Sequence, residues 1–202
     1  MAKKLYFYYG VMNSSKTLNL LATAYNFEEK GIPFMALKPS IDTRDGLSTI
    51  RSRAGLSREC VSVEKDADIY EAVKNYNNVL VARCSRPLEW ILVDECQFLT
   101  EEQVEQLANI VDDMEINVIC YGLRTDFQSK LFPASKRLFE IADEFHEFKA
   151  SCECGRKASI NARFDESGNI VSEGNQFLVG GNDIYKPMCR KCWQREIKDK
   201  KE

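Results

Sequence analysis

Short apolar runs alternate along most of the chain with segments whose apolar residues recur at helical spacing. The first run covers residues 5–9, stops at Gly10, and is followed by polar residues before Leu18, Leu20 and Leu21. An apolar run of this length that ends at a glycine is typical of a strand, whereas the spacing of the leucines is typical of a helix face. The pattern predicts a strand, a tight loop and a helix over residues 16–29.

The same alternation continues to about residue 150. Thr100 and Gln103 have the spacing of a capping box, which fixes the start of a helix there. We expect further strands at residues 34–37, 79–82, 90–93, 116–121 and 145–149, and helices at residues 66–76, from residue 100 onward and after residue 133.

Strands that alternate with helices predict an α/β fold, with a mostly parallel sheet covered by helices on both faces. In such sheets a ligand lies beyond the carboxyl ends of the strands. That rule brings the loop after Gly10, the pair Asp94-Glu95 and residues 122–127 to one edge of the sheet. We expect a binding site at this edge.

The loop between the first strand and the first helix has the spacing of a P-loop, Gly-x-x-x-x-Gly-Lys-Ser/Thr. Backbone N–H groups of a P-loop surround a polyphosphate, its lysine reaches the β- and γ-phosphates, and its hydroxyl holds Mg²⁺. Lys16 and Thr17 occupy those last two positions. Ser15 replaces the second glycine, which costs about 1 kcal/mol or more if this residue takes a positive φ. The alternative is an ordinary strand-to-helix turn.

Asp94 and Glu95 follow the apolar run at residues 90–93 and look like the end of a Walker-B strand. An aspartate at this position can hold Mg²⁺ through water or through Thr17. The side chain of Glu95 diverges from that of Asp94, so it can face an acceptor hydroxyl and take its proton during phosphoryl transfer. The alternative is that the pair caps the following helix.

The polar segment over residues 38–57 carries Asp42 and Arg44, and further arginines follow at positions 51, 53 and 58. One interpretation is a loop that faces the phosphates, with Arg44 stabilising their charge. The other is a solvated connection between two elements.

Composition narrows the class of protein. A chain of 202 residues with 44% hydrophobic content suits one domain with an appendage and a real core. The formal net charge of −3 gives no overall basic footprint, so we do not expect nucleic acid as a partner. No run approaches the ~20 apolar residues of a membrane span, and polar residues interrupt the one signal-like segment near the start. We expect a cytoplasmic protein with no membrane partner.

Four of the eight cysteines form two close pairs, Cys152 with Cys154 and Cys189 with Cys192. In a reducing compartment such pairs favour a metal over disulfides. Four thiolates around a tetrahedral Zn²⁺ leave no open position for catalysis, so we expect a structural zinc site. Unligated thiols or a disulfide pair are the alternative.

The stretch between the two cysteine pairs has features of a β-hairpin, with strands at residues 160–164 and 176–179 and a turn at residues 165–169. Because a segment this small buries too little apolar surface to become ordered by itself, we expect zinc to fix its two ends. We divide the chain into a nucleotide-binding domain over residues 1–150 and a zinc-binding subdomain over residues 151–202.

Gly180 and Gly181 would allow this subdomain to approach a flat ligand closely. Tyr185 either stacks on that ligand or packs within the subdomain.

Several short motifs follow one another in a set order. They are residues 10–17, Asp42-Thr43-Arg44, residues 94–98, 121–127 and 152–159, Gly180-Gly181 with Tyr185, and residues 189–192. In order and spacing they resemble the cytosolic, zinc-containing thymidine kinase family, and most closely its bacterial members. The resemblance covers nearly the whole chain, although residues 79–89 make a longer connection than the family leads us to expect.

The resemblance implies ATP-dependent phosphorylation of the 5′-hydroxyl of deoxythymidine, a homotetramer, and feedback inhibition by dTTP. Glu95 would be the catalytic base, Thr17 and Asp94 would belong to the Mg²⁺ site, and the zinc ligands would be Cys152, Cys154, Cys189 and Cys192. The implied ATP and phosphate site is Gly10, Val11, Met12, Asn13, Ser14, Ser15, Lys16, Thr17, Asp42, Arg44, Asp94 and Gln97. The implied nucleoside site is Met12, Phe98, Leu123, Phe127, Phe132, Val179, Gly180, Gly181 and Tyr185.

The same motifs are also compatible with a function other than a nucleoside kinase. The P-loop would power a nucleotide switch, or a zinc-ribbon ATPase that binds nucleic acid. The near balance of acidic and basic residues along the chain argues against the nucleic-acid alternative.

Overall fold

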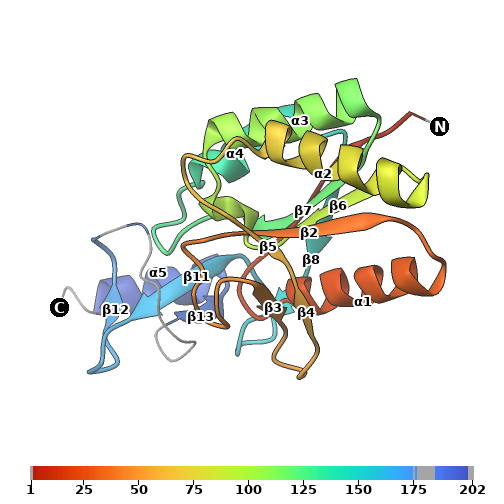
Figure 1. The fold of residues 1–202 in the computed structure, drawn as a ribbon. Coiled ribbons are helices and arrows are strands. Elements are labelled where there is room, and N and C mark those ends of the chain that lie inside the picture. Colours follow the sequence, from red (N-terminus) through yellow and green to blue (C-terminus); the bar gives the residue numbers. More distant parts are fainter. Residues whose placement is uncertain (1, 175, 177–184, 200–202) are drawn as a thin grey trace.

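The computed structural model describes residues 2–174, 176 and 185–199, and its centre is a six-stranded sheet (Figure 1). The strand order is β5-β2-β6-β7-β1-β8, and each neighbouring pair is parallel. The predicted parallel sheet is therefore confirmed. Its strands are β1 (Leu5–Gly10), β2 (Phe34–Pro39), β5 (Val61–Val63), β6 (Trp90–Val93), β7 (Asn117–Leu123) and β8 (Glu144–Phe148).

Helices cover both faces of this sheet (Figure 1). Helix α1 (Lys16–Glu29) lies on one face and has the predicted bounds. The other face is covered by α2 (Ile69–Cys84), α3 (Glu101–Met114) and α4 (Pro133–Ile141). A three-residue 3-10 helix, η1 (Cys96–Phe98), precedes α3.

Alternate residues of the central strand β6 face the two helical layers. Leu92 packs in the cluster that contains Leu20 of α1, whereas Ile91 and Val93 pack in the cluster that contains Leu107 of α3. Successive side chains of a strand point to opposite faces, so a strand buried on both sides is apolar throughout. This explains why the strand-forming runs in the sequence show no polar alternation.

The predicted helix starts are confirmed at α3 and α4. Thr100 Oγ1 accepts the N–H of Gln103 at 3.1 Å, and Gln103 Oε1 accepts the N–H of Thr100 at 3.1 Å. Pro133 begins α4, where its lack of an N–H removes no helical hydrogen bond.

The short strand predicted at residues 79–82 is wrong, because these residues continue α2. Val79 and Val81 are 51% and 43% exposed, so they face solvent on the outer side of the helix, and their β-branched side chains have no sheet to join. The helix ends at Ser85, which has a φ of 54°, and the Leu88 N–H then donates to Asn77 Oδ1 at 2.7 Å. The long connection at residues 79–89 is thus an extension of α2 and a return segment fastened to it.

The polar segment at residues 38–57 is not a continuous loop. It leads into a hairpin made of β3 (Thr49–Arg51) and β4 (Ser57–Glu59), which lies beside α1. Ile50 is 1% exposed and packs with Leu20 and Leu92, so one apolar residue fixes an otherwise polar segment to the core.

The cysteine-rich part of the chain forms two small antiparallel sheets and a final helix. One sheet pairs β9 (Ala150–Ser151) with β10 (Lys157–Ala158). The other has β11 (Ile160–Phe164) between β12 (Ile170–Val171) and β13 (Tyr185–Met188), and α5 (Arg190–Asp199) follows. The first hairpin strand and the turn after it are as predicted, but the strand that follows the turn is β12. Of the second predicted strand, residues 177–179 lie outside the described residues.

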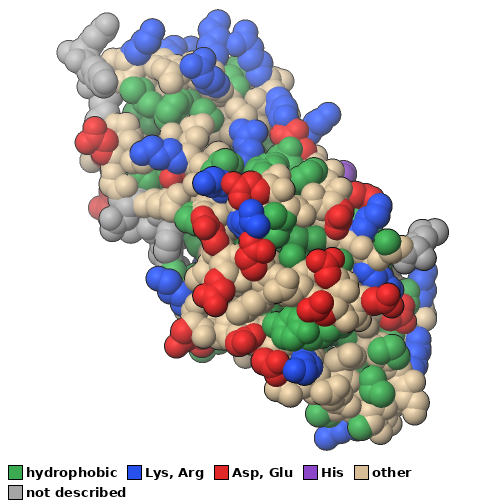
Figure 2. Space-filling view, turned by 90° about the horizontal axis from the view of Figure 1, so that it is seen from above, with side chains coloured by type: hydrophobic (Ala, Val, Ile, Leu, Met, Phe, Trp, Pro, Cys, Tyr) green, Lys and Arg blue, Asp and Glu red, His purple; other side chains and the backbone are tan. Residues whose placement is uncertain are grey.

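Acidic and basic side chains are interspersed over the helical face formed by α2 and α3 (Figure 2). Among the described residues, this face presents no uniformly basic surface of the kind that binds nucleic acid. Within the same residues, no helix is both long and apolar enough to cross a membrane.

Candidate active site

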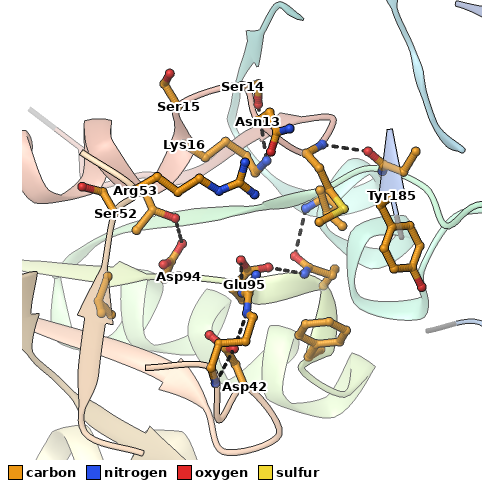
Figure 3. A pocket seen from close by; sticks show the side chains of 18 of the residues that line it. Asn13, Ser14, Ser15, Lys16, Asp42, Ser52, Arg53, Asp94, Glu95 and Tyr185 are labelled. Atoms are coloured by element: carbon orange, nitrogen blue, oxygen red, sulfur yellow. Dashed lines mark hydrogen bonds and ion pairs between the residues drawn. The ribbon is translucent and has the colours of Figure 1, made fainter. Parts of the chain in front are cut away.

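A cavity of about 510 Å³ lies at the carboxyl ends of the central strands. Its walls come from the loop after β1, the segment after β2, the residues that follow β6 and β7, and single residues of the cysteine-rich part (Figure 3). The structure therefore brings together at one edge the three segments that the sequence placed there. Gly10 and Val11 are not among the lining residues, whereas the predicted residues from Met12 to Thr17 are.

Lys16 lies at the base of this cavity and is 9% exposed. Its Nζ donates to the carbonyl oxygen of Val11 at 2.8 Å and to Ser14 Oγ at 3.3 Å. Burial lowers the pKa of Lys16, while the charges of Glu95 and Asp94 oppose that shift. The ammonium group is held in the loop that precedes α1, in the position from which a P-loop lysine meets phosphate.

Ser15 takes a φ of 63°, so the residue that replaces the usual glycine does adopt the left-handed conformation. Its side chain makes no capping hydrogen bond to α1 that would offset this strain. Gly10 cannot be replaced in the same way, since a Cβ there would lie 2.5 Å from Ser14 Oγ and 2.6 Å from the Phe148 carbonyl oxygen.

Asp94 faces the start of α1, and Thr17 Oγ1 donates to its Oδ1 at 3.3 Å. Burial raises the pKa of Asp94, and the neighbouring charge of Glu95 raises it further, to about 7. A buried carboxylate next to a hydroxyl offers the hard oxygen ligands that Mg²⁺ prefers. Thr17 and Asp94 could therefore hold this ion between them.

Glu95 points away from Asp94 and is held by two donors. Arg44 Nη2 donates to its Oε1 at 2.5 Å, and Gln97 Nε2 donates to its Oε2 at 2.6 Å. Burial favours the protonated form, but the charges of Arg44 and Lys16 keep the pKa of Glu95 below its usual value. The carboxylate therefore stays ionised and able to accept a proton.

The alternative that Asp94-Glu95 caps a helix is wrong. Glu95 does precede η1, but its side chain makes no capping hydrogen bond. The longer helix α3 is capped by Thr100 instead.

Gln97 lines the cavity and links Glu95 to the backbone of β7. While its Nε2 holds Glu95, its Oε1 accepts the N–H of Leu123 at 2.9 Å. The backbone of β7 approaches closely at Gly122, where a Cβ would lie 2.6 Å from Gln97 Oε1 and 2.5 Å from Cys96 Sγ. Both polar ends of the Gln97 amide therefore have partners in the protein.

Arg44 is positioned by a chain of charged groups. Its Nε donates to Asp42 Oδ1 at 2.7 Å, and Asp42 Oδ2 lies 3.8 Å from Lys38 Nζ. Lys38 is 1% exposed and also donates to the carbonyl oxygens of Gly46 and Thr49, at 2.6 and 2.9 Å. The sequence analysis missed Lys38, although a lysine directly after an apolar strand run was a signal that could have found it.

An apolar wall faces these charged groups across the cavity. Phe98 and Phe132 meet edge to face with their ring centroids 6.1 Å apart. All of the described residues that were predicted to bind the nucleoside line this cavity: Met12, Phe98, Leu123, Phe127, Phe132 and Tyr185. Tyr185 pairs with Arg163 of β11 and also faces the cavity, so the two interpretations of this residue are not exclusive (Figure 3). Val179, Gly180 and Gly181 lie outside the described residues.

Asn161 and Arg53 also line the cavity, and the sequence analysis did not assign either of them to it. Asn161 is a buried polar residue within strand β11, and that pattern was its only signal in the sequence. Arg53 belonged to a polar segment whose hairpin was not foreseen.

The four cysteines of the two pairs form one cluster, with all four Sγ atoms within 4.8 Å of one another. A Zn–S bond of about 2.3 Å implies S–S edges of about 3.8 Å in a tetrahedron, and Cys154 Sγ lies 3.6 Å from Cys189 Sγ. The backbone N–H of Cys192 lowers the pKa of Cys189 to about 6, which favours a thiolate. The donor set and spacing therefore fit a zinc ion. Val11 packs against Cys152 and Cys189, so the cluster lies next to the P-loop.

A buried lysine at the start of a helix, a threonine-aspartate pair and an ionised glutamate around one cavity define an α/β phosphotransferase of the P-loop type. A family profile described as thymidine kinase (TK) matches residues 3–193. The chain belongs to the thymidine kinase family.

Curated relatives agree with this assignment over almost their whole length. The chain is 42% identical over 196 residues to a thymidine kinase of Yersinia pseudotuberculosis, covering 96% of each chain. It is 45% identical over 190 residues to a thymidine kinase of Agrobacterium fabrum, covering 94% of this chain and 95% of the relative. A solved Pif1 helicase from Candida albicans is 14% identical with a TM-score of 0.45, covering 73% of this chain and 36% of its own, which is too distant to bear on fold or function.

Proposed function

We propose that this protein is an ATP-dependent thymidine kinase, which transfers the γ-phosphoryl group of ATP to the 5′-hydroxyl of deoxythymidine and yields dTMP and ADP. The observation that carries the proposal is that Lys16 and Glu95 line the same cavity as three phenylalanines that could enclose a nucleobase, Phe98, Phe127 and Phe132. The shared name of the relatives, thymidine kinase, supports the choice of acceptor.

In this mechanism Lys16 and the backbone of residues 12–17 bind the β- and γ-phosphates. Glu95 orients the 5′-hydroxyl and takes its proton as the hydroxyl oxygen forms a bond to the γ-phosphorus and the bond to the ADP oxygen breaks. Mg²⁺, held by Thr17 and Asp94, would neutralise charge on the phosphate oxygens. Arg44 and Gln97 keep Glu95 ionised and aimed at the hydroxyl.

Selectivity for thymine follows from pairing of buried polar groups. In the proposal, backbone groups of residues 179–181 bond the base edge, and Phe98, Phe127 and Tyr185 enclose the ring. A backbone acceptor that pairs with thymine N3–H would meet another acceptor at the same position of cytosine. Two buried polar groups would then be left unpaired, which would weaken binding by about several kcal/mol. Deoxyuridine lacks only a methyl group, worth about 1 kcal/mol, so it should be a weaker substrate.

The finer expectations from the sequence belong to the same proposal. They are a nucleotide-binding domain at residues 1–150, a zinc-binding subdomain at residues 151–202 whose ion is structural, a homotetramer, feedback inhibition by dTTP, and a cytoplasmic location. The cysteine cluster supports the zinc ion, and the small sheets that surround it support the subdomain.

The test is to incubate the protein with Mg-ATP and a panel of nucleosides and to follow ADP release. Deoxythymidine should stimulate release far more than deoxycytidine or adenosine. The nucleotide switch and the nucleic-acid-binding ATPase predict no stimulation by deoxythymidine, so ADP release at the same rate with and without it would reject the kinase proposal.

A further inference from the structure

The side chain of Asn161 bridges two segments that line the cavity from different parts of the chain. Its Oδ1 accepts the backbone N–H of Met12, in the loop after β1, at 2.7 Å. Its Nδ2 donates to the carbonyl oxygen of Thr125, in the segment after β7, at 3.0 Å. All three residues line the cavity. One planar amide therefore ties the two segments together at the cavity wall.

The position of Asn161 is set by the strand that carries it. This residue lies in β11, the central strand of its small sheet, and is paired with Pro187 of β13. Directly before β11, the Ser159 carbonyl oxygen accepts a hydrogen bond from Arg124 Nη2 at 3.2 Å, so the start of this strand is also bonded to the end of β7. The amide is thus presented from an ordered strand of the cysteine-rich part of the chain.

The loop after β1 has a backbone that needs support. Two of its residues other than glycine have a positive φ, Asn13 at 62° and Ser15 at 63°. Such residues are strained and keep their conformation only where surrounding contacts hold them. Inside the loop, Ser14 Oγ donates to the Val11 carbonyl oxygen at 2.8 Å. The bond from Asn161 adds a contact from 149 residues further along the chain.

The segment after β7 is a closed turn that carries Phe127, one of the aromatic residues of the cavity. Asp126 Oδ1 accepts the N–H groups of Gln128 and Lys130, both at 2.9 Å. The Asp126 N–H donates in turn to the Lys130 carbonyl oxygen at 2.9 Å. Because the turn is closed by its own hydrogen bonds, the bond at Thr125 helps to place the whole turn relative to the loop after β1.

Asparagine suits this bridge because its side chain carries an acceptor and a donor in one plane. Leucine, of similar size, offers neither group. The reaction itself depends on how well the donor and the acceptor are aligned, and a misplacement of about 1 Å can lower a rate by about 100-fold.

We propose that Asn161 is a positioning residue for phosphoryl transfer, which keeps the loop after β1 aligned with the segment after β7. It acts through the backbone of Met12 and Thr125. The inference rests on the proposed function, because that function assigns the phosphate donor to the first segment and the nucleoside to the second. It gives the cysteine-rich part of the chain a role in aligning the two reactants.

Rapid-quench measurement of single-turnover phosphoryl transfer tests this inference. Wild type and Asn161→Leu, each in excess over radiolabelled ATP, are mixed with Mg²⁺ and saturating deoxythymidine. The transfer rate of Asn161→Leu should be lower by about 10- to 100-fold, because the two segments lose their link. The Kd values of a non-hydrolysable ATP analogue and of deoxythymidine, each titrated alone by calorimetry, should rise by no more than about threefold, because each ligand is held mainly by one segment.

Asn117→Leu is the matched control. Asn117 is 8% exposed, and its Oδ1 accepts the Lys4 N–H at 3.1 Å. It begins β7, so it lies at the edge of the sheet opposite the cavity. This variant should lose stability but keep the wild-type transfer rate.

Asn161→Gln serves where Asn161→Leu does not fold. It keeps a donor and an acceptor on a side chain that is one methylene longer, so the amide is displaced and the rate should still fall by about fivefold or more. The inference is overturned if Asn161→Leu, or Asn161→Gln in its place, transfers phosphate at the wild-type rate. It is also overturned if Asn117→Leu loses as much rate, since the loss would then reflect general destabilisation.

These outcomes are separable from the proposed function. If deoxythymidine accepts phosphate at equal rates in wild type and Asn161→Leu, the kinase proposal stands and the role of Asn161 fails. If another nucleoside of the panel is the acceptor, the same ratio of rates is measured with that nucleoside, so the named acceptor fails while Asn161 is judged by its own ratio. Transfer to no nucleoside rejects both.

Discussion

Asn161 Oδ1 accepts a hydrogen bond from the backbone N–H of Met12 at 2.7 Å. The same side chain donates from its Nδ2 to the Thr125 carbonyl oxygen at 3.0 Å. One amide of β11 thus joins the P-loop to the segment after β7, although β11 follows the first cysteine pair in the chain. Asn161 is 2% exposed, so water does not replace either bond.

Asn161→Ala should destabilise the protein by about 2–4 kcal/mol, since it leaves two buried backbone groups without partners. Urea unfolding measures this change. Asn78→Ala removes an exposed asparagine from α2 and should stay within about 0.5 kcal/mol of wild type. Equal effects of the two substitutions would show that the Asn161 bonds contribute nothing.

Glu95→Gln should lower kcat by about 10²- to 10⁴-fold, because an amide cannot take the proton of the hydroxyl. The affinity for deoxythymidine, measured by calorimetry, should change little, because the side chain keeps its size. Glu102→Gln changes an exposed residue of α3 and should leave kcat unaltered. Normal turnover in Glu95→Gln would remove this residue from the role of base.

Ser15→Gly should raise the free energy of unfolding by about 1 kcal/mol, because a glycine takes the observed φ of 63° without strain. No side-chain capping bond is lost in the exchange. Ser14→Gly is the matched contrast: its Oγ donates to the Val11 carbonyl oxygen at 2.8 Å, so this variant should be destabilised. A loss of stability in Ser15→Gly would contradict the strain at this position.

Asp94 should make the Mg²⁺-free protein less stable as the pH rises. Its pKa is about 7 in the folded protein, against 3.8 as the ordinary value, so between these pH values the folded state binds more protons than the unfolded state. Stability therefore falls as the pH rises from about 4 to 7. In Asp94→Asn this slope should flatten. Between pH 5 and pH 8 the free energy of unfolding should fall by roughly 1–3 kcal/mol more in wild type than in the variant.

Urea unfolding of both proteins at pH 5 and pH 8, with chelator and without nucleotide, measures this difference. Asp112→Asn, on the exposed side of α3, should follow the wild-type slope. An identical slope in wild type and Asp94→Asn would show that burial of Asp94 has no such effect.

Protein purified without chelator should contain about one zinc per chain, bound by the four-cysteine cluster. Cys154→Ser should lose the metal, and it should also weaken ATP binding because Val11 of the P-loop packs against this cluster. Cys84→Ser alters an exposed thiol at the end of α2 and should keep the zinc. Elemental analysis that finds no zinc in wild type would reject the site.

The fold followed closely from the pattern of apolar positions. The runs that form β6 and β7 are buried on both faces, and side chains of β1 pack in the clusters on both faces, which leaves a continuous apolar signal. The strand predicted at residues 79–82 was wrong for a related reason. Valines on an exposed helix face resemble strand residues when the neighbouring turns of the helix are ignored. The hairpin β3–β4 was missed because Ile50 alone carries its apolar signal.

The sequence by itself determined the local parts of the site: the loop with Lys16 and Thr17, the pair Asp94-Glu95, and the two cysteine pairs. Each of these depends on residues adjacent in the chain, whose geometry follows from short-range spacing. Only the tertiary structure decided that Arg44 holds Glu95, that Asn161 fastens the P-loop, and that Arg53 faces Lys16. Those contacts join segments far apart in the chain, and their partners are set by how the sheet edge and the hairpin pack, which no local spacing encodes.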